Sequence, residues 1–244
     1  MGHPCAVLPA LRWLVVVLCL LVASGCDALD LSGSEDEPDD ATPVFATTFT
    51  RIAPQGYIDL SLEVSNPTDR PVTLTGRLVA RDAAGDELPG VTVSSAYGIE
   101  RGQLLLMPGG DVDLVQLDGE GADQVADVTL EDVRQRPEDA AAAEEPIEVT
   151  GLGKDGRELT YDGAAIAARV DNPNSVAVRV RVVLLVLAAP KTGVPQQAVE
   201  VRDVTTIELA PGASKVVPLD AETTRVLRRR ALTDFVSLRP VFAP

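Results

Sequence analysis

Residues 27–244 contain neither cysteine nor histidine. Its three cysteines are Cys5, Cys19 and Cys26, and its single histidine is His3. Serine and cysteine hydrolases commonly need an imidazole base, and zinc sites depend on His and Cys ligands. Neither kind of site can be assembled from residues 27–244. No disulfide can form there either, so packing and hydrogen bonds must stabilise the fold.

Other catalytic signatures are also missing. None of Lys154, Lys191 and Lys215 has a serine three positions earlier, which excludes a Ser-x-x-Lys dyad, and no Gly-x-Ser-x-Gly elbow occurs. The Gly-Lys pair ending at Lys154 lacks the spacer and the Ser or Thr of a phosphate-binding loop. Carboxylate pairs stay available, because any acidic chain offers candidates. We expect a protein that is not an enzyme.

Positive charge is scarce relative to negative charge, and the net charge is −16. Such a balance repels nucleic acid and anionic lipid head groups, so we expect no nucleic-acid partner. The acidic, glycine-containing stretch Asp118–Asp123 lacks the Gly and Glu spacing of an EF-hand, and ordinary turn chemistry explains it. We expect no metal and no dissociable cofactor.

The N-terminal segment contains an uninterrupted apolar run, Trp13–Ala23, which follows Arg12. Ser24, Gly25 and Cys26 follow Ala23, the last residue of the run. A positive end, an apolar core and small residues are the layout of a secretory signal peptide. The run falls short of the ~20 residues that span a bilayer, which disfavours an uncleaved anchor.

This segment resembles the bacterial lipoprotein signal, although Ala23 stands where the family usually has Leu. The resemblance implies that residues 1–25 are removed between Gly25 and Cys26, and that Cys26 carries a covalent diacylglycerol and an acyl chain. The protein would then be exported and lipid-anchored to a bacterial membrane, facing the periplasm or the cell exterior. An ordinary cleaved signal with a chance cysteine is the alternative.

Residues 26–43 are expected to form a disordered acidic tether. The part from Asp27 to Thr42 carries seven carboxylates, little apolar content and one proline. It cannot bury enough surface to offset the entropy of ordering, and charge repulsion extends it.

From residue 44 the sequence changes to short runs of Val, Ile, Leu and Thr with Gly, Pro and Asp between them. Alternating apolar residues over Tyr57–Val64 and Val72–Ala80 predict half-buried strands. Further strands are expected at 103–106, 111–117 and 125–133. A polar, alanine-rich stretch at 135–146 predicts a linker or one short helix, which separates a first domain (44–134) from a second (147–244).

The second domain repeats features of the first. Asn66-Pro67 corresponds to Asn172-Pro173, and Pro108-Gly109 corresponds to Pro211-Gly212, with separations of 41 and 38 residues. An Asn-Pro pair makes a corner between strands, because Pro withholds an N–H and Asn caps the turn with its side chain. The repeat therefore predicts two copies of one fold.

The pattern resembles immunoglobulin-like families. Arg169–Val180, which contains Asn-Pro-Asn, is similar to the strand pair of the water-stress (LEA type 2) domain, and Val64–Val72 is more similar to bacterial lipoprotein sandwich modules. The resemblance implies an all-β chain with two tandem immunoglobulin-like β-sandwiches. These families carry no catalytic residues, so none is transferred.

Two segments of the second domain stand apart. Val182–Leu187 is apolar at every position, as expected for a strand covered on both faces or lying in a domain interface. Arg179 and Arg181, just before it, are expected to face outward. Asp220–Leu232 predicts a helix with Asp220 as N-cap and arginines in its last turn.

These observations favour a membrane-anchored, non-enzymatic envelope lipoprotein that acts as a protein-interaction or scaffolding module. Its partner would be another envelope protein, contacted through exposed sheet edges. The alternative is a binder of a small or lipidic ligand, inside a sandwich or between the domains. A hydrophobic pocket beside Val182–Leu187 would favour the ligand binder, and a fully packed core would favour the interaction module.

Overall fold

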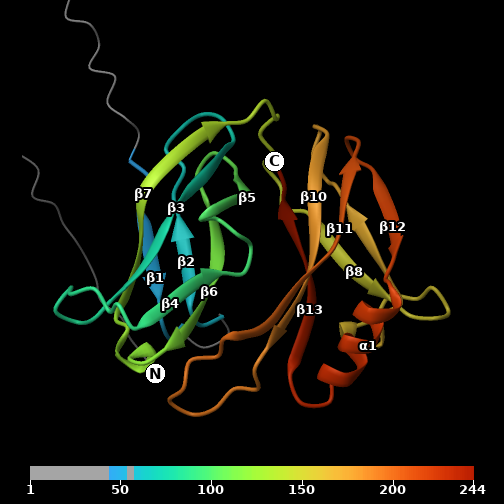
Figure 1. The fold of residues 1–244 in the computed structure, drawn as a ribbon. Helices are drawn as coiled ribbons and strands as arrows, with labels where there is room; N and C mark the ends of the chain where they lie inside the picture. The colour runs from blue at the N-terminus through green and yellow to red at the C-terminus, as the bar shows by residue number, and fades with distance from the viewer. Residues whose placement is uncertain (1–43, 54–57) are drawn as a thin grey trace, which may run out of the picture. The chain divides into compact units, whose positions relative to one another are not determined.

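The structure, a computed structural model, describes residues 44–53 and 58–244. Within these ranges the chain forms thirteen strands, one α-helix and two short 3-10 helices, and the strands pair antiparallel (Figure 1). The expected all-β class is confirmed. The described residues form one compact unit. The expected signal peptide, the expected tether and the expected lipidation at Cys26 lie outside them.

The first half, residues 44–137, contains two sheets with the strand orders β1-β2-β6-β4 and β5-β3-β7. Its elements are β1 (Thr47–Thr50), β2 (Ser61–Val64), β3 (Val72–Arg81), β4 (Val91–Ser95), β5 (Arg101–Leu106), β6 (Asp111–Gly119), η1 (Ala122–Gln124) and β7 (Asp127–Pro137). The expected strand before Asn66 is shorter than its alternation predicted. Leu60 has a φ of 53°, which interrupts the extended backbone, although its side chain is buried.

The second half, residues 147–244, contains two sheets with the orders β12-β9-β8 and β11-β10-β13. Its elements are β8 (Glu148–Leu152), η2 (Asp162–Ala164), β9 (Ala167–Asp171), β10 (Val178–Leu187), β11 (Ala198–Leu209), β12 (Ser214–Pro218), α1 (Ala221–Arg230) and β13 (Phe235–Phe242). The residues between the halves include the expected linker, 135–146, but β7 continues through Pro137 into this range.

The two halves have matching strand orders. The series β1-β2-β6 of the first half corresponds to β8-β9-β12 of the second, and β5-β3-β7 corresponds to β11-β10-β13. The halves differ at one sheet edge, where β4 extends the first series and no described strand extends the second. The internal repeat read from the Asn-Pro and Pro-Gly pairs therefore has a counterpart in the strand order.

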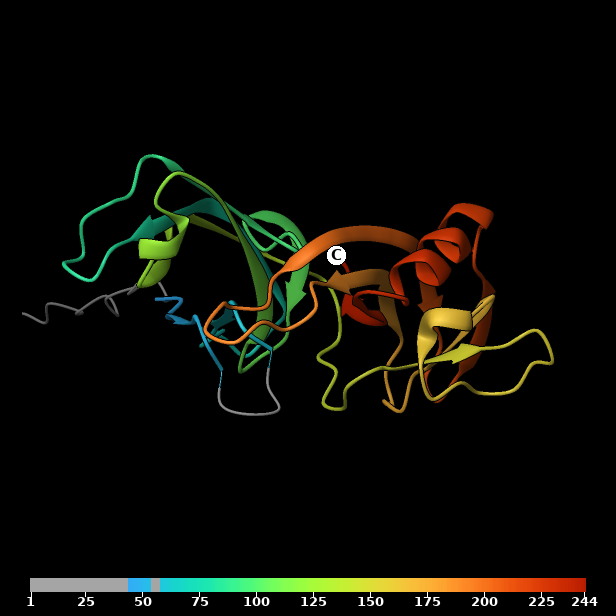
Figure 2. The ribbon, with the colours of Figure 1, turned by 90° about the horizontal axis from the view of Figure 1, so that it is seen from below.

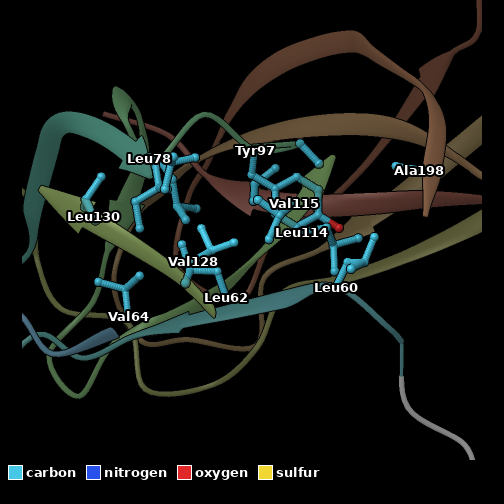
Figure 3. Packing of buried hydrophobic residues seen from close by; sticks show 14 of the residues in the cluster. Leu60, Leu62, Val64, Leu78, Tyr97, Leu114, Val115, Val128, Leu130 and Ala198 are labelled. Carbon is cyan, nitrogen blue, oxygen red and sulfur yellow. The ribbon is translucent and has the colours of Figure 1, made fainter. Parts of the chain in front are cut away.

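Each half has its own apolar core. The first core draws buried side chains from both sheets of the first half, including Leu62 and Val64 of β2, Val115 of β6 and Val128 of β7 (Figure 3). The second core joins β9, β10, β11 and β13 with α1. Burial of each Val or Leu side chain contributes about 1.5–3 kcal/mol, so these two clusters supply the main drive for folding.

Strand β10 connects the two cores. Val180, Val182, Leu184 and Val186 point into the second core, whereas Val183, Leu185 and Leu187 point into the first. The prediction of a strand covered on both faces is confirmed. The prediction that Arg181 faces outward is wrong: the residue lies on the face that meets the first half and is 8 % exposed.

Helix α1 forms where its sequence predicts. The Asp220 carboxylate accepts a hydrogen bond from Thr223 N at 2.6 Å, and Val226 and Leu227 are buried. Figure 2 shows the helix close to the segment that carries η2, against which it packs. Among the described residues, no helix has the length and apolar character needed to cross a bilayer.

Candidate functional site

The two Asn-Pro corners are built in the same way. Asn66 and Asn172 are each 2 % exposed. Asn66 Nδ2 donates to the carbonyl oxygens of Arg70 and Leu106 at 2.9 and 3.2 Å. Its Oδ1 accepts from the backbone N–H of Thr68 at 3.0 Å. The side chain therefore joins the corner to the end of β5, which explains why a buried amide occupies this position.

In the second corner, Asn172 Nδ2 donates to the carbonyl oxygens of Val176 and Ala210, both at 2.9 Å. Its Oδ1 accepts from the backbone N–H of Asn174 at 3.0 Å. The Pro-Gly turns lie beside the corners in both halves, because Gly109 N donates to Asn66 O and Gly212 N donates to Asn174 O, each at 3.0 Å. The structure thus brings together the expected turn residues, which are Asn66, Pro67, Pro108 and Gly109 in one half and Asn172, Pro173, Pro211 and Gly212 in the other.

The second corner has an additional function, which the sequence did not reveal. Asn174 is buried, and its Oδ1 accepts from the backbone N–H groups of Glu144 and Glu145, both at 2.8 Å. Its Nδ2 donates to Glu145 O at 2.9 Å. The Asn-Pro-Asn motif therefore fixes the segment that connects the two halves. In the first corner Thr68 takes the equivalent place and makes only local bonds.

Polar contacts accompany the apolar contact between the halves. Gln116 Nε2 donates to Ala198 O at 2.6 Å, and Gln196 N donates to Asp59 Oδ2 at 2.7 Å. Ala198 itself belongs to the first core, although it lies in β11 (Figure 3). The contact is thus apolar at its centre and hydrogen-bonded around it, which is the composition of a stable interface.

Arg181 is the buried cation of this contact. It donates to the Tyr97 carbonyl oxygen and, at 3.5 Å, to Gln103 Oε1 of the first half. Its Nε has no hydrogen-bond partner and lies 3.5 Å from Asp203 Oδ1, on a side chain that is 63 % exposed. The guanidinium is therefore only partly satisfied.

A buried carboxylate holds the loop that Arg181 contacts. Asp113 is 0 % exposed, and its two oxygens accept from the backbone N–H groups of Tyr97, Ile99 and Leu114 at 2.7, 3.0 and 2.7 Å. Burial raises the pKa of Asp113 to about 6, and the three N–H donors act against that rise. Because backbone N–H groups bind both of its oxygens, the structural role of Asp113 is to fix this loop.

Strand β12 forms one edge of its sheet in the second half. The strand pairs with β9 on one side and ends its sheet, and Ser214, Lys215 and Val216 are exposed. Hydrogen bonds at its two ends join the pairs Ala213–Asn172 and Leu219–Ile166. Hydrogen-bonded residues alternate along an antiparallel strand, so Lys215 and Val217 also bond to β9. Ser214 and Val216 then direct their N–H and C=O groups away from the sheet.

The matching edge in the first half is covered. Strand β4 pairs with the far side of β6 from Val91 opposite Gly119 to Ser95 opposite Val115. The chain after β4 continues this cover, since Ala96 N donates to Leu114 O at 2.7 Å. In the described part of the second half, β12 has no such neighbour. The two halves therefore share a strand order but not a protected edge.

A cleft of about 280 Å³ lies between β5 and the C-terminus and is lined in part by Leu105, Met107, Val178 and Phe242. It reaches β10 only at Val178 and Arg179. In the residues that the structure covers, no group of three or more His, Cys, Asp or Glu side chains is placed to hold a metal ion. Comparison of the chain with protein-family models, curated proteins and solved structures found no match.

Proposed function

We propose that this chain is a membrane-anchored bacterial envelope lipoprotein that acts, without catalysis, as a protein-interaction or scaffolding module. The signal-like segment ending at Cys26 supports the anchor. The acidic stretch after it supports a tether that spaces the folded part from the membrane. The partner would be another envelope protein, and the chain would face the periplasm or the cell exterior.

Each half would be an immunoglobulin-like β-sandwich. The support is the pairing of two antiparallel sheets around one core in each half, together with the matching strand orders. The equivalent bonds of Asn66 and Asn172 add to it, because a shared corner in the same place relates the two halves. The resemblance of Arg169–Val180 to the LEA type 2 domain agrees with this assignment.

The observation that carries the interaction function is the unpaired edge of β12. Ser214 and Val216 offer outward N–H and C=O groups, and Val216 adds a side chain that is 55 % exposed. An extended segment of a partner can hydrogen-bond to such an edge, which is recognition by strand addition. Pro218 lacks an N–H and limits the edge at its C-terminal end.

The ligand-binding alternative has weaker support. A hydrophobic cavity beside Val182–Leu187 would favour it, whereas these side chains are enclosed in the two cores. The cleft near Val178 and Phe242 is small and lies at the other end of β10. Packed cores and an open edge favour protein interaction.

Substitution of Val216 by proline tests the edge. Val216→Pro removes one outward N–H but leaves the bonds to β9 in place, so the fold should persist. Val216→Thr is the matched control, because it changes the side chain and keeps the N–H. In crosslinking and pull-down from native membranes, we expect a specific protein that is lost with Val216→Pro and kept with Val216→Thr. Equal recovery with both variants would contradict strand addition at β12.

The anchor needs a separate test. Replacement of Cys26 by Ser removes the acylation site, and we expect the variant to leave the membrane fraction. If Cys26→Ser stays membrane-bound to the same extent as the natural chain, the lipoprotein assignment is wrong. This result would leave the β12 proposal untouched, since the edge does not depend on the anchor.

A further inference from the structure

Three large apolar side chains are exposed together at one end of the second half. Leu232 is 84 % exposed, Phe235 is 54 % exposed and Tyr161 is 45 % exposed. Leu232 and Phe235 lie in and after the turn between α1 and β13, and Tyr161 precedes η2. The Tyr161 hydroxyl donates to Asp234 O at 3.1 Å, which places the ring beside this turn. We name these three residues the tip.

The tip is held by ordered backbone. Thr233 N and Asp234 N both donate to Arg230 O, at 3.0 and 2.8 Å, and Ala231 N donates to Leu227 O at 2.9 Å. These bonds continue the end of α1 into a tight turn that leaves the Leu232 side chain exposed. The apolar side chains therefore project from a fixed support. A projection of this kind suits insertion into a soft surface better than reception of another protein's side chains.

Positive charge gathers next to the tip, in a chain whose net charge is −16. A shallow hollow of about 540 Å³ on α1 is lined by Ala221, Thr224, Arg225, Arg228 and Arg229. Among the described residues, Arg228 and Arg229 form no ion pair.

Three acidic groups on α1 or beside the tip are already engaged. Asp234 pairs with Arg230 at 3.4 Å, and Glu222 pairs with Arg225 and Arg202. Asp162 accepts from Leu238 N at 2.8 Å. The two unpaired guanidiniums at the end of α1 thus stay available for an external anion.

We propose that the tip docks the second half onto an anionic lipid bilayer. Leu232 and Phe235 enter the interfacial region, Tyr161 lies at head-group level, and Arg228 and Arg229 contact lipid phosphates. Exposed apolar and aromatic side chains beside arginines are the composition of membrane-surface elements. The net charge of −16 repels anionic lipid as a whole, so the attraction is local to Arg228 and Arg229 and acts only when the tip faces the bilayer. The projecting Leu232 favours a bilayer over an acidic protein.

This inference goes beyond the proposed function and does not depend on acylation of Cys26. An anchor would confine the chain to a membrane but would not orient its folded part. Docking through the tip would orient it, because the tip fixes which end of the second half meets the lipid. The edge of β12 would then be presented in a defined direction to a partner.

The test measures the membrane contact at single positions. The full chain carries Cys5→Ser, Cys19→Ser and Cys26→Ser, and one new cysteine, Thr233→Cys or Val194→Cys, receives an environment-sensitive fluorophore. Val194 is 56 % exposed, so its label serves as the matched control. Vesicles contain phosphatidylcholine alone or with an equal amount of phosphatidylglycerol, and lipids that carry a quencher report contact.

With the anionic vesicles, we expect a blue shift and lipid quenching of the label at 233, and neither change at 194. Any contact through residues 1–43 is common to both labels and cannot produce this difference. Arg228→Gln with Arg229→Gln should abolish the preference for phosphatidylglycerol, and Leu232→Ser should abolish the quenching. Circular dichroism checks that the variants are folded.

Two outcomes would overturn the proposal. Equal quenching at positions 233 and 194 would mean that the folded part has no specific contact with lipid. A label at 233 that stays in water with both kinds of vesicle would exclude the bilayer and leave Arg228 and Arg229 to an acidic protein surface.

Discussion

Asp113 and Arg181 hold the backbone of Tyr97 from opposite sides. The Asp113 carboxylate accepts from Tyr97 N at 2.7 Å, and the Arg181 guanidinium donates to the Tyr97 carbonyl oxygen. Asp113 belongs to the first half and Arg181 to the second. The loop after β4 is therefore fixed jointly by a buried anion of its own half and a buried cation of the other.

The raised pKa of Asp113 predicts a pH-dependent contribution to stability. Burial raises this pKa from 3.8 to about 6, so between these values the folded state binds more protons than the unfolded state. The free energy of unfolding contributed by Asp113 therefore increases as pH falls from about 6 to about 4. The shift corresponds to about 3 kcal/mol.

Comparison with Asp113→Asn isolates this contribution, because the variant cannot titrate at position 113. Urea unfolding of both proteins between pH 7 and pH 4 measures it. We expect the stability of the natural chain relative to the variant to rise by about 3 kcal/mol as the pH falls over this range. A difference that does not change with pH would show that the buried carboxylate keeps an ordinary pKa.

We expect two substitutions of Arg181 to change the free energy of unfolding by different amounts. Its stem is buried, its Nε lacks a hydrogen-bond partner, and Asp203 stays mostly solvated. Arg181→Met keeps the apolar volume and leaves no buried charge unpaired, so we expect a change within about 1 kcal/mol. Arg181→Ala also removes the packing and should cost about 2 kcal/mol or more. Denaturant unfolding distinguishes these values, and a loss near 3 kcal/mol for Arg181→Met would mean that the bonds to Tyr97 and Gln103 dominate.

We expect Asn66 and Asn172 to contribute similar amounts to the free energy of unfolding. Asn172→Ala removes the Nδ2 donor to the carbonyl oxygens of Val176 and Ala210, although Ala210 O keeps Ala213 N as a donor. Asn66→Ala removes the donor to the carbonyl oxygens of Arg70 and Leu106, although Arg70 O keeps the Thr68 hydroxyl. We expect each substitution to lower the free energy of unfolding by about 2–3 kcal/mol. Ser175→Ala, at an exposed position of the same turn, should stay within about 0.5 kcal/mol.

Asn172→Asp adds a pH test to this prediction. The variant places a carboxylate oxygen against two carbonyl oxygens, and protonation restores a donor. Its loss of stability should therefore be larger at pH 7 than at pH 4. A loss for Asn172→Asp that is independent of pH would contradict the assigned hydrogen bonds.

Sequence reasoning succeeded where local chemistry determines local structure. An Asn-Pro pair constrains its own backbone and places an amide at the corner, so the position of Asn66 and Asn172 could be predicted without the fold. The N-cap Asp220 has the same property, because its carboxylate reaches an N–H three residues later. These features depend on contacts within a few residues.

The contacts of Asp113 and Arg181 could not be predicted in this way, although the sequence carries a sign that both residues are buried. Asp113 lies on the same strand face as the buried Val115 and Leu117, and Arg181 lies on the same face as Val183 and Leu185. A charged residue at an inward position indicates a buried partner, but the partner of each comes from a distant segment. The open edge of β12 was equally hidden, since it depends on the absence of a neighbouring strand.

Strand β10 is expected to couple the unfolding of the two halves. Leu185 is 0 % exposed and projects from β10 of the second half into the first core, whereas its neighbour Leu184 projects into the second. Leu185→Ala should cost about 2–5 kcal/mol, in the usual range for a buried leucine. Because the side chain packs against the first half, amide hydrogen exchange should speed up in β2 and β6 as well as in β10.

Leu184→Ala is the matched control, since it removes the same atoms from the opposite face of the same strand. If the halves unfold as one unit, both variants accelerate exchange of the most protected amides in both halves by similar factors, because those amides exchange only through global opening. If the halves open separately, Leu184→Ala affects only the second half. Faster exchange confined to β10 and its neighbours in both variants would mean that Leu185 fills space without coupling the cores. The apolar contact would then orient the two halves relative to each other without stabilising them against unfolding.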